Sequence, residues 1–85
     1  MTELIDKRLV DEAMDAYLDW REECAAVWAA SERWVGASVG DAPMAAAAYR
    51  AALDREERAS DVYADLMNLV AAASRRSSEP IGAGR

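Results

Sequence analysis

Apolar residues recur at alternating steps of three and four along two long stretches of the chain. In the first stretch the repeat has a single polar member: Val10, Ala13, Tyr17, Trp20, Cys24, Val27, Ser31 and Trp34. This spacing marks one face of a helix, because a strand would alternate at every second residue. Glycine and proline are absent from residues 2–35. The pattern therefore predicts one helix over about residues 3–35.

The second stretch follows the same rule, and Glu56 is its one charged member: Ala45, Tyr49, Ala52, Glu56, Ala59, Tyr63, Leu66, Val70 and Ala73. It predicts a second helix over about residues 42–74. The connection, residues 36–41, contains the internal turn signals. We expect Gly36 to end the first helix in a left-handed conformation and Asp41 to cap the second.

Two helices of equal length joined by a short turn favour an antiparallel hairpin. At about 1.5 Å rise per residue, each helix spans roughly 50 Å. The predicted fold class is therefore all-α, with one helical hairpin over residues 1–74. Residues 75–85 have turn and linker composition, so we expect a flexible C-terminal tail there.

The two repeats together form an apolar seam along which the helices are expected to meet. Further apolar residues beside the repeats make the apolar face of each helix wider than this seam. Trp28 lies eight residues after Trp20 and is therefore turned about 80° away from it. Burying a large side chain contributes roughly 1.5–3 kcal/mol, so a lone hairpin would forfeit much of its stability. We expect two hairpins to dimerise into a symmetric four-helix bundle, with a heteromeric helical complex as the open alternative. The predicted core and interface residues are Val10, Tyr17, Trp20, Cys24, Val27, Trp28, Trp34, Tyr49, Leu53, Tyr63, Leu66 and Val70.

Composition narrows the class of protein. The 85 residues are 53% hydrophobic and 31% charged, which suits one small folded domain. A net charge of −6 argues against nucleic acid or an anionic membrane surface as the main partner. No apolar run approaches the roughly 18–20 residues of a membrane span, and the first residues lack the pattern of a signal peptide. We expect a soluble, cytoplasmic protein with no membrane insertion.

The chain holds no histidine and one cysteine, which removes several kinds of chemistry. A Cys/His zinc site, a disulfide framework and a histidine-dependent triad are excluded within one chain. A di-iron bundle would need Glu-x-x-His motifs beside its carboxylates. Cys24 lies on the apolar seam, where a small buried hydrophobe is the expected role. The sequence predicts no metal, no cofactor and no enzyme activity.

Glu56 is the remaining polar candidate because its place on the seam predicts burial. In an antiparallel hairpin it lies opposite about residues 20–24, near Arg21, Glu23 and Cys24. One interpretation is an acid/base or redox site beside the thiol. The favoured interpretation is a Glu56–Arg21 ion pair, within or between chains, that sets the register of the helices.

The segment Trp34-Val35-Gly36 sits at the turn of the predicted acidic hairpin and resembles the Trp-x-Gly arrangement of the WXG100 proteins. The resemblance covers three residues and the general shape. It implies a small helical dimer exported by a specialised secretion system of actinobacteria and related bacteria. Members commonly carry Tyr-x-x-x-Asp/Glu after the second helix, whereas here Tyr63 lies inside that helix and Met67 follows four residues later.

Together these features predict a small, acidic, non-catalytic helical protein that acts as a self-associating protein–protein interaction module. Affinity would come from the aromatic and alanine-rich seam, and specificity from the acidic outer face. A WXG100-like exported hairpin and a subunit of a heteromeric helical complex remain the alternatives.

Overall fold

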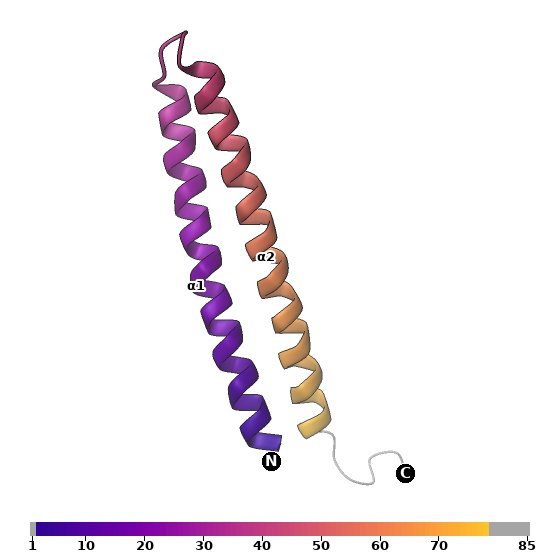
Figure 1. The fold of residues 1–85 in the computed structure, drawn as a ribbon. Helices are drawn as coiled ribbons and strands as arrows, with labels where there is room; N and C mark the ends of the chain where they lie inside the picture. The colour runs from indigo at the N-terminus through magenta and orange to yellow at the C-terminus, as the bar shows by residue number, and fades with distance from the viewer. Residues whose placement is uncertain (1, 79–85) are drawn as a thin grey trace.

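The computed structural model describes residues 2–78, and describes side chains for residues 7–76. Its two helices, α1 (Thr2–Val35) and α2 (Ala42–Ser78), pack against each other as an antiparallel hairpin (Figure 1). The expected all-helical hairpin is confirmed. Within the described residues, neither helix has a stretch long and apolar enough to cross a membrane.

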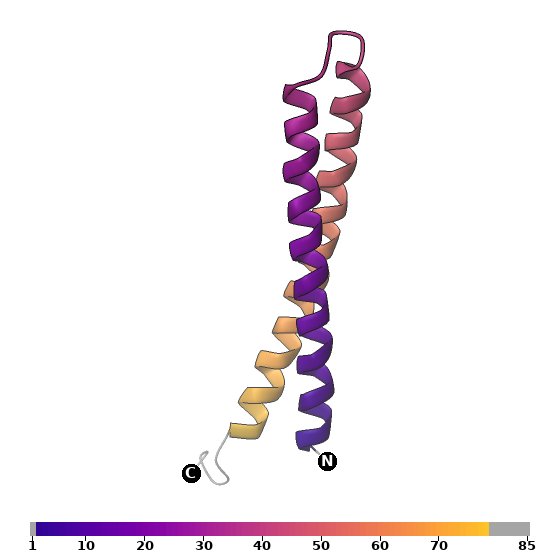
Figure 2. The same ribbon diagram turned by 90° about the vertical axis from the view of Figure 1, so that its left-hand side faces the viewer.

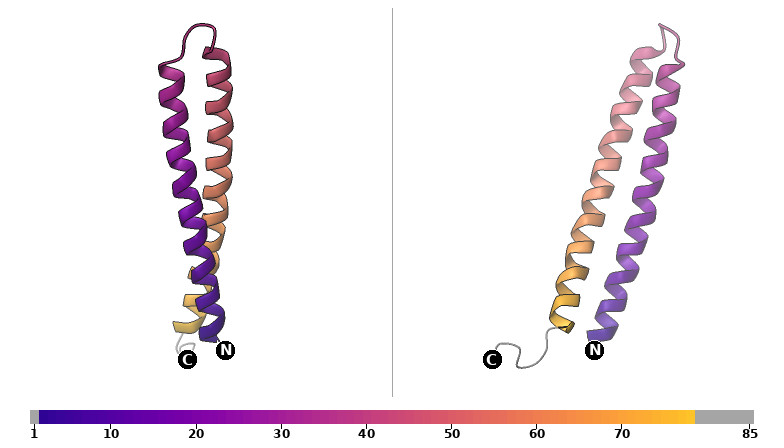
Figure 3. Two further views of the ribbon diagram at one scale, coloured as in Figure 1. Left: turned by 60° about the vertical axis from the view of Figure 1, so that its left-hand side comes forward. Right: turned by 180° about the vertical axis from the view of Figure 1, so that it is seen from behind.

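The hairpin is a rod one helix layer thick. Its Cα atoms extend over 69 × 23 × 13 Å. The helices run side by side and cross at a shallow angle, with the start of α1 and the end of α2 at the end opposite the turn (Figures 1 and 2). Seen from the remaining sides, no third element of the described chain covers either broad side of the pair (Figure 3).

The end of α1 differs from expectation. The Gly36 N–H donates to the Glu32 carbonyl at 3.0 Å, and the Ala37 N–H donates to the Trp34 carbonyl at 3.2 Å. The φ angle of Gly36 lies outside the left-handed region, and an added Cβ would meet only ordinary contact with the Glu32 carbonyl at 3.6 Å. The predicted left-handed glycine is therefore wrong. The last turn tightens because Ala37 bonds to the residue three positions earlier, and the chain leaves the helix without a positive φ at Gly36.

The turn is held mainly by Ser38. Its carbonyl accepts the N–H groups of Asp41 and Ala42 at 3.1 and 2.9 Å, and its hydroxyl also accepts from Asp41 at 3.3 Å. The Asp41 carbonyl then accepts the Ala45 N–H at 3.0 Å. Asp41 thus occupies the position that precedes α2, as the sequence predicts.

Helix α2 continues to Ser78, past the predicted end at residue 74. Alanines at 71–73 favour helix, and Arg75 and Arg76 in the last turn suit the negative end of the helix dipole. The predicted helix end at residue 74 is therefore wrong, because residues 75–78 of the expected tail are helical. The remainder of that tail, residues 79–85, lies outside the described residues.

The contact between the helices is made by small side chains. Among the described residues, the buried hydrophobic side chains are all alanines: Ala13, Ala16, Ala30, Ala52 and Ala73. Ala52 is 1% exposed, and no large described side chain is fully buried. The larger seam residues whose side chains are described are half-buried at best.

Candidate functional site

Aromatic side chains cross the contact line midway along the rod. Trp20 of α1 stacks on Tyr63 of α2, with ring centroids 5.8 Å apart and planes 13° apart. Tyr17 contacts both rings, at 6.1 Å from Trp20 and 5.5 Å from Tyr63. These half-buried rings are seam residues in the sequence pattern, and the structure brings them together. They fix which levels of the two helices face each other.

A second aromatic contact lies near the turn. The rings of Trp34 and Tyr49 lie 5.4 Å apart, with planes inclined at 35°. Tyr49 is half-buried, whereas Trp34 retains an exposed edge. The two aromatic contacts together set one register along most of the rod.

Glu56 is half-buried and is partnered by an indole. The Trp20 Nε1–H donates to its Oε2 at 2.7 Å. Arg21 turns aside: its Nη1 donates to the Tyr17 hydroxyl at 3.3 Å, and its guanidinium carbon lies 6.0 Å from the Tyr17 ring centroid. The predicted Glu56–Arg21 ion pair within the chain is therefore wrong. Neighbouring residues on a helix point about 100° apart, so Trp20 faces the contact line while Arg21 faces its flank.

An ion pair between the helices joins Glu23 and Arg55, with the Arg55 Nε 3.3 Å from the Glu23 Oε1. It lies on one side of the contact line and remains partly exposed. The spacing of the sequence predicts Glu23 near this level, but it does not single out Arg55 as its partner. The missed signal is that both residues flank the seam on the side where an antiparallel pair brings them together.

Cys24 is a half-buried member of the seam. Within the described residues, no three His, Cys, Asp or Glu side chains cluster as a metal site requires. Glu56, the polar candidate at the same level, accepts a hydrogen bond from the Trp20 indole.

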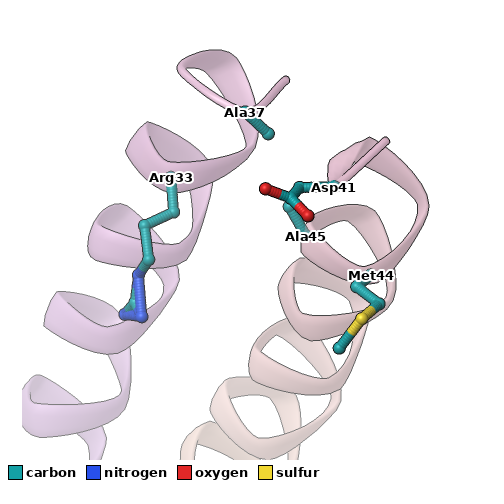
Figure 4. A pocket seen from close by; sticks show the side chains of 5 residues that line it. All are labelled: Arg33, Ala37, Asp41, Met44 and Ala45. Carbon is teal, nitrogen blue, oxygen red and sulfur yellow. The ribbon is translucent and has the colours of Figure 1, made fainter. Parts of the chain in front are cut away.

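Two shallow hollows lie on the Glu23–Arg55 side. The hollow nearer the turn has a volume of about 370 Å³ and is lined by Arg33, Ala37, Asp41, Met44 and Ala45 (Figure 4). In that view Arg33 extends along α1 away from the turn, while the Asp41 carboxylate points into the gap. A second hollow of about 380 Å³ shares two of these residues and is lined by Ala26, Ala30, Arg33, Ala45, Ala48, Ala51 and Arg55. We call the two together the alanine groove.

The other side of the rod carries larger apolar side chains. At 100° per residue, Trp28 lies 200° from Ala30 and Leu53 lies 200° from Arg55, so both point away from the alanine groove. The same relation places Met14 opposite Ala16. We define the apolar face as Met14, Trp28, Val35, Leu53 and Met67, all of which are exposed on the hairpin. Trp28 is 71% exposed.

Residues of the apolar face are matched in level. Along α1, Trp28 lies between Glu23 and Trp34. Along α2, Leu53 lies between their respective partners, Arg55 and Tyr49. Trp28 is therefore level with Leu53. Just beyond the Tyr17–Tyr63 contact, Met14 and Met67 form a second apolar level.

The chain matches no family model, and no curated protein or solved structure matches it.

The predicted core and interface residues divide into two groups on the hairpin. Eight are half-buried along the contact line: Tyr17, Trp20, Cys24, Val27, Tyr49, Tyr63, Leu66 and Val70. Four are exposed: Val10, Trp28, Trp34 and Leu53. The first group packs within the hairpin, and an interface role for the second group stays a prediction.

Proposed function

We propose that this chain is a non-catalytic, self-associating protein–protein interaction module, which works as two hairpins packed into a four-helix bundle. One observation carries the proposal. The buried hydrophobic side chains of the described residues are five alanines, whereas twelve larger apolar side chains of the same residues are exposed. The hairpin has apolar surface for a second packing layer, and a partner would supply that layer.

The energetics support association. A fully buried large side chain contributes roughly 1.5–3 kcal/mol relative to an exposed one, and a whole domain is stable by only about 5–15 kcal/mol. Covering Trp28, Leu53 and two methionines therefore contributes on the scale of the total stability. Small domains without disulfides or metals commonly obtain this missing core by oligomerisation.

Charge supports a closed assembly. The chain carries 16 acidic and 10 basic residues, and most charged residues whose side chains are described are exposed. Such a surface disfavours further stacking once the apolar face is covered. The half-buried carboxylate of Glu56 accepts a hydrogen bond from Trp20, which suits a structural role rather than a catalytic one.

Light scattering for mass, with circular dichroism on the same sample, tests the proposal. We expect a helical species of twice the 9.3 kDa chain mass at micromolar concentration. A helical, stable particle of one chain mass would contradict it. A one-chain particle that binds an apolar dye would instead favour a subunit of a heteromeric helical complex.

A further inference from the structure

We infer that a second copy of this chain docks on the apolar face, turned about the long axis of the rod so that both turns lie at one end. This inference rests on the proposed self-association and adds which face is used and in which orientation. In this arrangement α1 of each copy packs on α2 of the other. Every neighbouring pair of helices in the bundle is then antiparallel, as in a four-helix bundle with short loops.

The apolar face is large enough for a stable dimer. Helices of about 34 residues span roughly 50 Å, and two helices side by side are about 20 Å wide. This area is on the order of 1,000 Å² per copy, whereas a standard stable interface buries about 800 Å² per partner. The groove on the other side is shallow, and five of the seven residues that line its larger hollow are alanines.

The apolar face matches itself when the copy is turned about the long axis. A two-fold interface must be self-complementary, because the same patch is used by both copies. Since Trp28 is level with Leu53, it meets Leu53 of the second copy. Met14 likewise meets Met67 of the second copy. Each apolar level therefore closes on itself and leaves no large apolar side chain opposite a charge.

Charges at the margin of the face select the same orientation. Glu32 and Arg50 are exposed and lie at the level of the Trp34–Tyr49 contact along the rod. Turning the copy about the long axis brings Glu32 toward Arg50 of the second copy. At mid-rod, Arg21 and Glu57 follow Trp20 and Glu56 in sequence, so Arg21 is brought toward Glu57 of the second copy.

The reversed orientation places like charges together. A two-fold axis across the rod would pack α1 on α1 of the second copy. To keep apolar residues in contact, Met14 would have to meet Trp28, which centres the axis on Arg21. Arg21 would then face its own copy, and Asp11 would lie near Glu32. Like-charge juxtaposition disfavours this register.

A matched pair of variants tests the face. Met14, on the apolar face, is 55% exposed, and Val62, on the alanine-groove side, is 53% exposed. We expect Met14→Glu to reduce the solution mass to one chain at concentrations where the unmodified chain is a dimer, while Val62→Glu leaves the dimer intact. The reverse result, loss in both variants, or loss in neither would overturn the proposed face. A one-chain mass for the unmodified protein would instead contradict the proposed function itself.

A charge exchange tests the orientation through affinity. Glu32→Arg is expected to raise the dimer Kd roughly tenfold, because two surface ion pairs become repulsive, and Arg50→Glu in the same chain should restore it. The reversed orientation makes the opposite prediction. In the reversed orientation, Glu32→Arg would place a positive charge near Asp11 of the second copy and lower the dimer Kd. That result would overturn the inference.

A distance measurement tests the orientation without disturbing the interface. Val39 lies in the turn and is 95% exposed, so Val39→Cys in a Cys24→Ala background carries one spin label away from any contact. With both turns at one end, the two labels should lie within about 30 Å of each other. Turns at opposite ends of the rod would separate them by about 50 Å, and that result would overturn the orientation.

Discussion

Trp20 and Glu56 join α1 to α2 through a hydrogen bond of 2.7 Å between the indole N–H and a carboxylate oxygen. The same indole stacks on Tyr63, so the ring is held by α2 at two points. The Trp20 indole has one N–H, and the Glu56 carboxylate lies at one level of α2. Their hydrogen bond therefore specifies a single register of the two helices. Glu56 therefore acts as a register residue although it lies among apolar neighbours.

Replacing Glu56 is expected to weaken the hairpin. Glu56→Ala removes the acceptor of a part-buried indole and should lower the free energy of unfolding by about 1–3 kcal/mol. Glu56→Gln retains a carbonyl acceptor and should cost less. Urea unfolding at a fixed chain concentration measures both. Glu22→Ala, at an exposed outer position, is the matched control and should lie within about 0.5 kcal/mol of the unmodified chain. Equal losses for Glu56→Ala and Glu22→Ala would refute the register role.

Tyr63 tests the aromatic contacts. Tyr63→Ala removes the ring that stacks on Trp20 and should cost about 2–3 kcal/mol, because the side chain is half-buried. Tyr63→Phe keeps the ring and should cost less than about 1 kcal/mol. Folding and association are expected to weaken together in Tyr63→Ala and in Trp20→Ala. Full helicity with an unchanged solution mass in either alanine variant would show that the seam assignment is wrong.

Ala52 tests the close approach of the helices. Because it is the most buried of the described alanines, Ala52→Leu should force the helices apart and cost about 1–3 kcal/mol. Ala47→Leu introduces the same side chain at an exposed position of α2 and should change stability by less than about 0.5 kcal/mol. Thermal unfolding followed by circular dichroism compares the two. A tolerated leucine at position 52 would mean that the contact between α1 and α2 is looser than the structure has it.

Gly36 tests the end of α1. Because its φ is not left-handed and space exists for a Cβ, Gly36→Ala should be neutral or stabilise the chain by about 0.4–1 kcal/mol, through reduced flexibility of the unfolded state. A left-handed glycine would give the opposite sign. A loss of 1 kcal/mol or more in urea unfolding would therefore restore the original sequence-based expectation.

The helices and their pairing were predictable from the sequence because the three-and-four spacing of residues such as Tyr17, Trp20 and Tyr63 directly reports a helix face. The turn was predictable because Gly36 and Asp41 interrupt two long helix-forming stretches. The end of α2 was less predictable. The end of a helix depends on small differences in helix propensity and on favourable charges such as that of Arg76. The turn and linker composition of the residues near the terminus hides these contributions in the sequence.

Side-chain partners were not predictable at the same level. The sequence placed Glu56 opposite residues 20–24, but two candidates one residue apart point in directions about 100° apart. The indole of Trp20 reaches the carboxylate, while Arg21 packs on Tyr17. Nor did the sequence set the distance between the helices. Alanines such as Ala52 bring them close, and that closeness leaves Trp28 outside the hairpin.

The dependence of the melting temperature on chain concentration tests the central claim most directly, because it asks whether folding requires a second copy. If self-association completes the core, Tm should rise by about 5–10 °C over a hundredfold increase in concentration, since mass action stabilises the associated state. Circular dichroism melts from about 1 to 100 μM cover this range. A Tm that stays constant across it, in a chain of single mass, would show that the hairpin is stable alone and would contradict the claim.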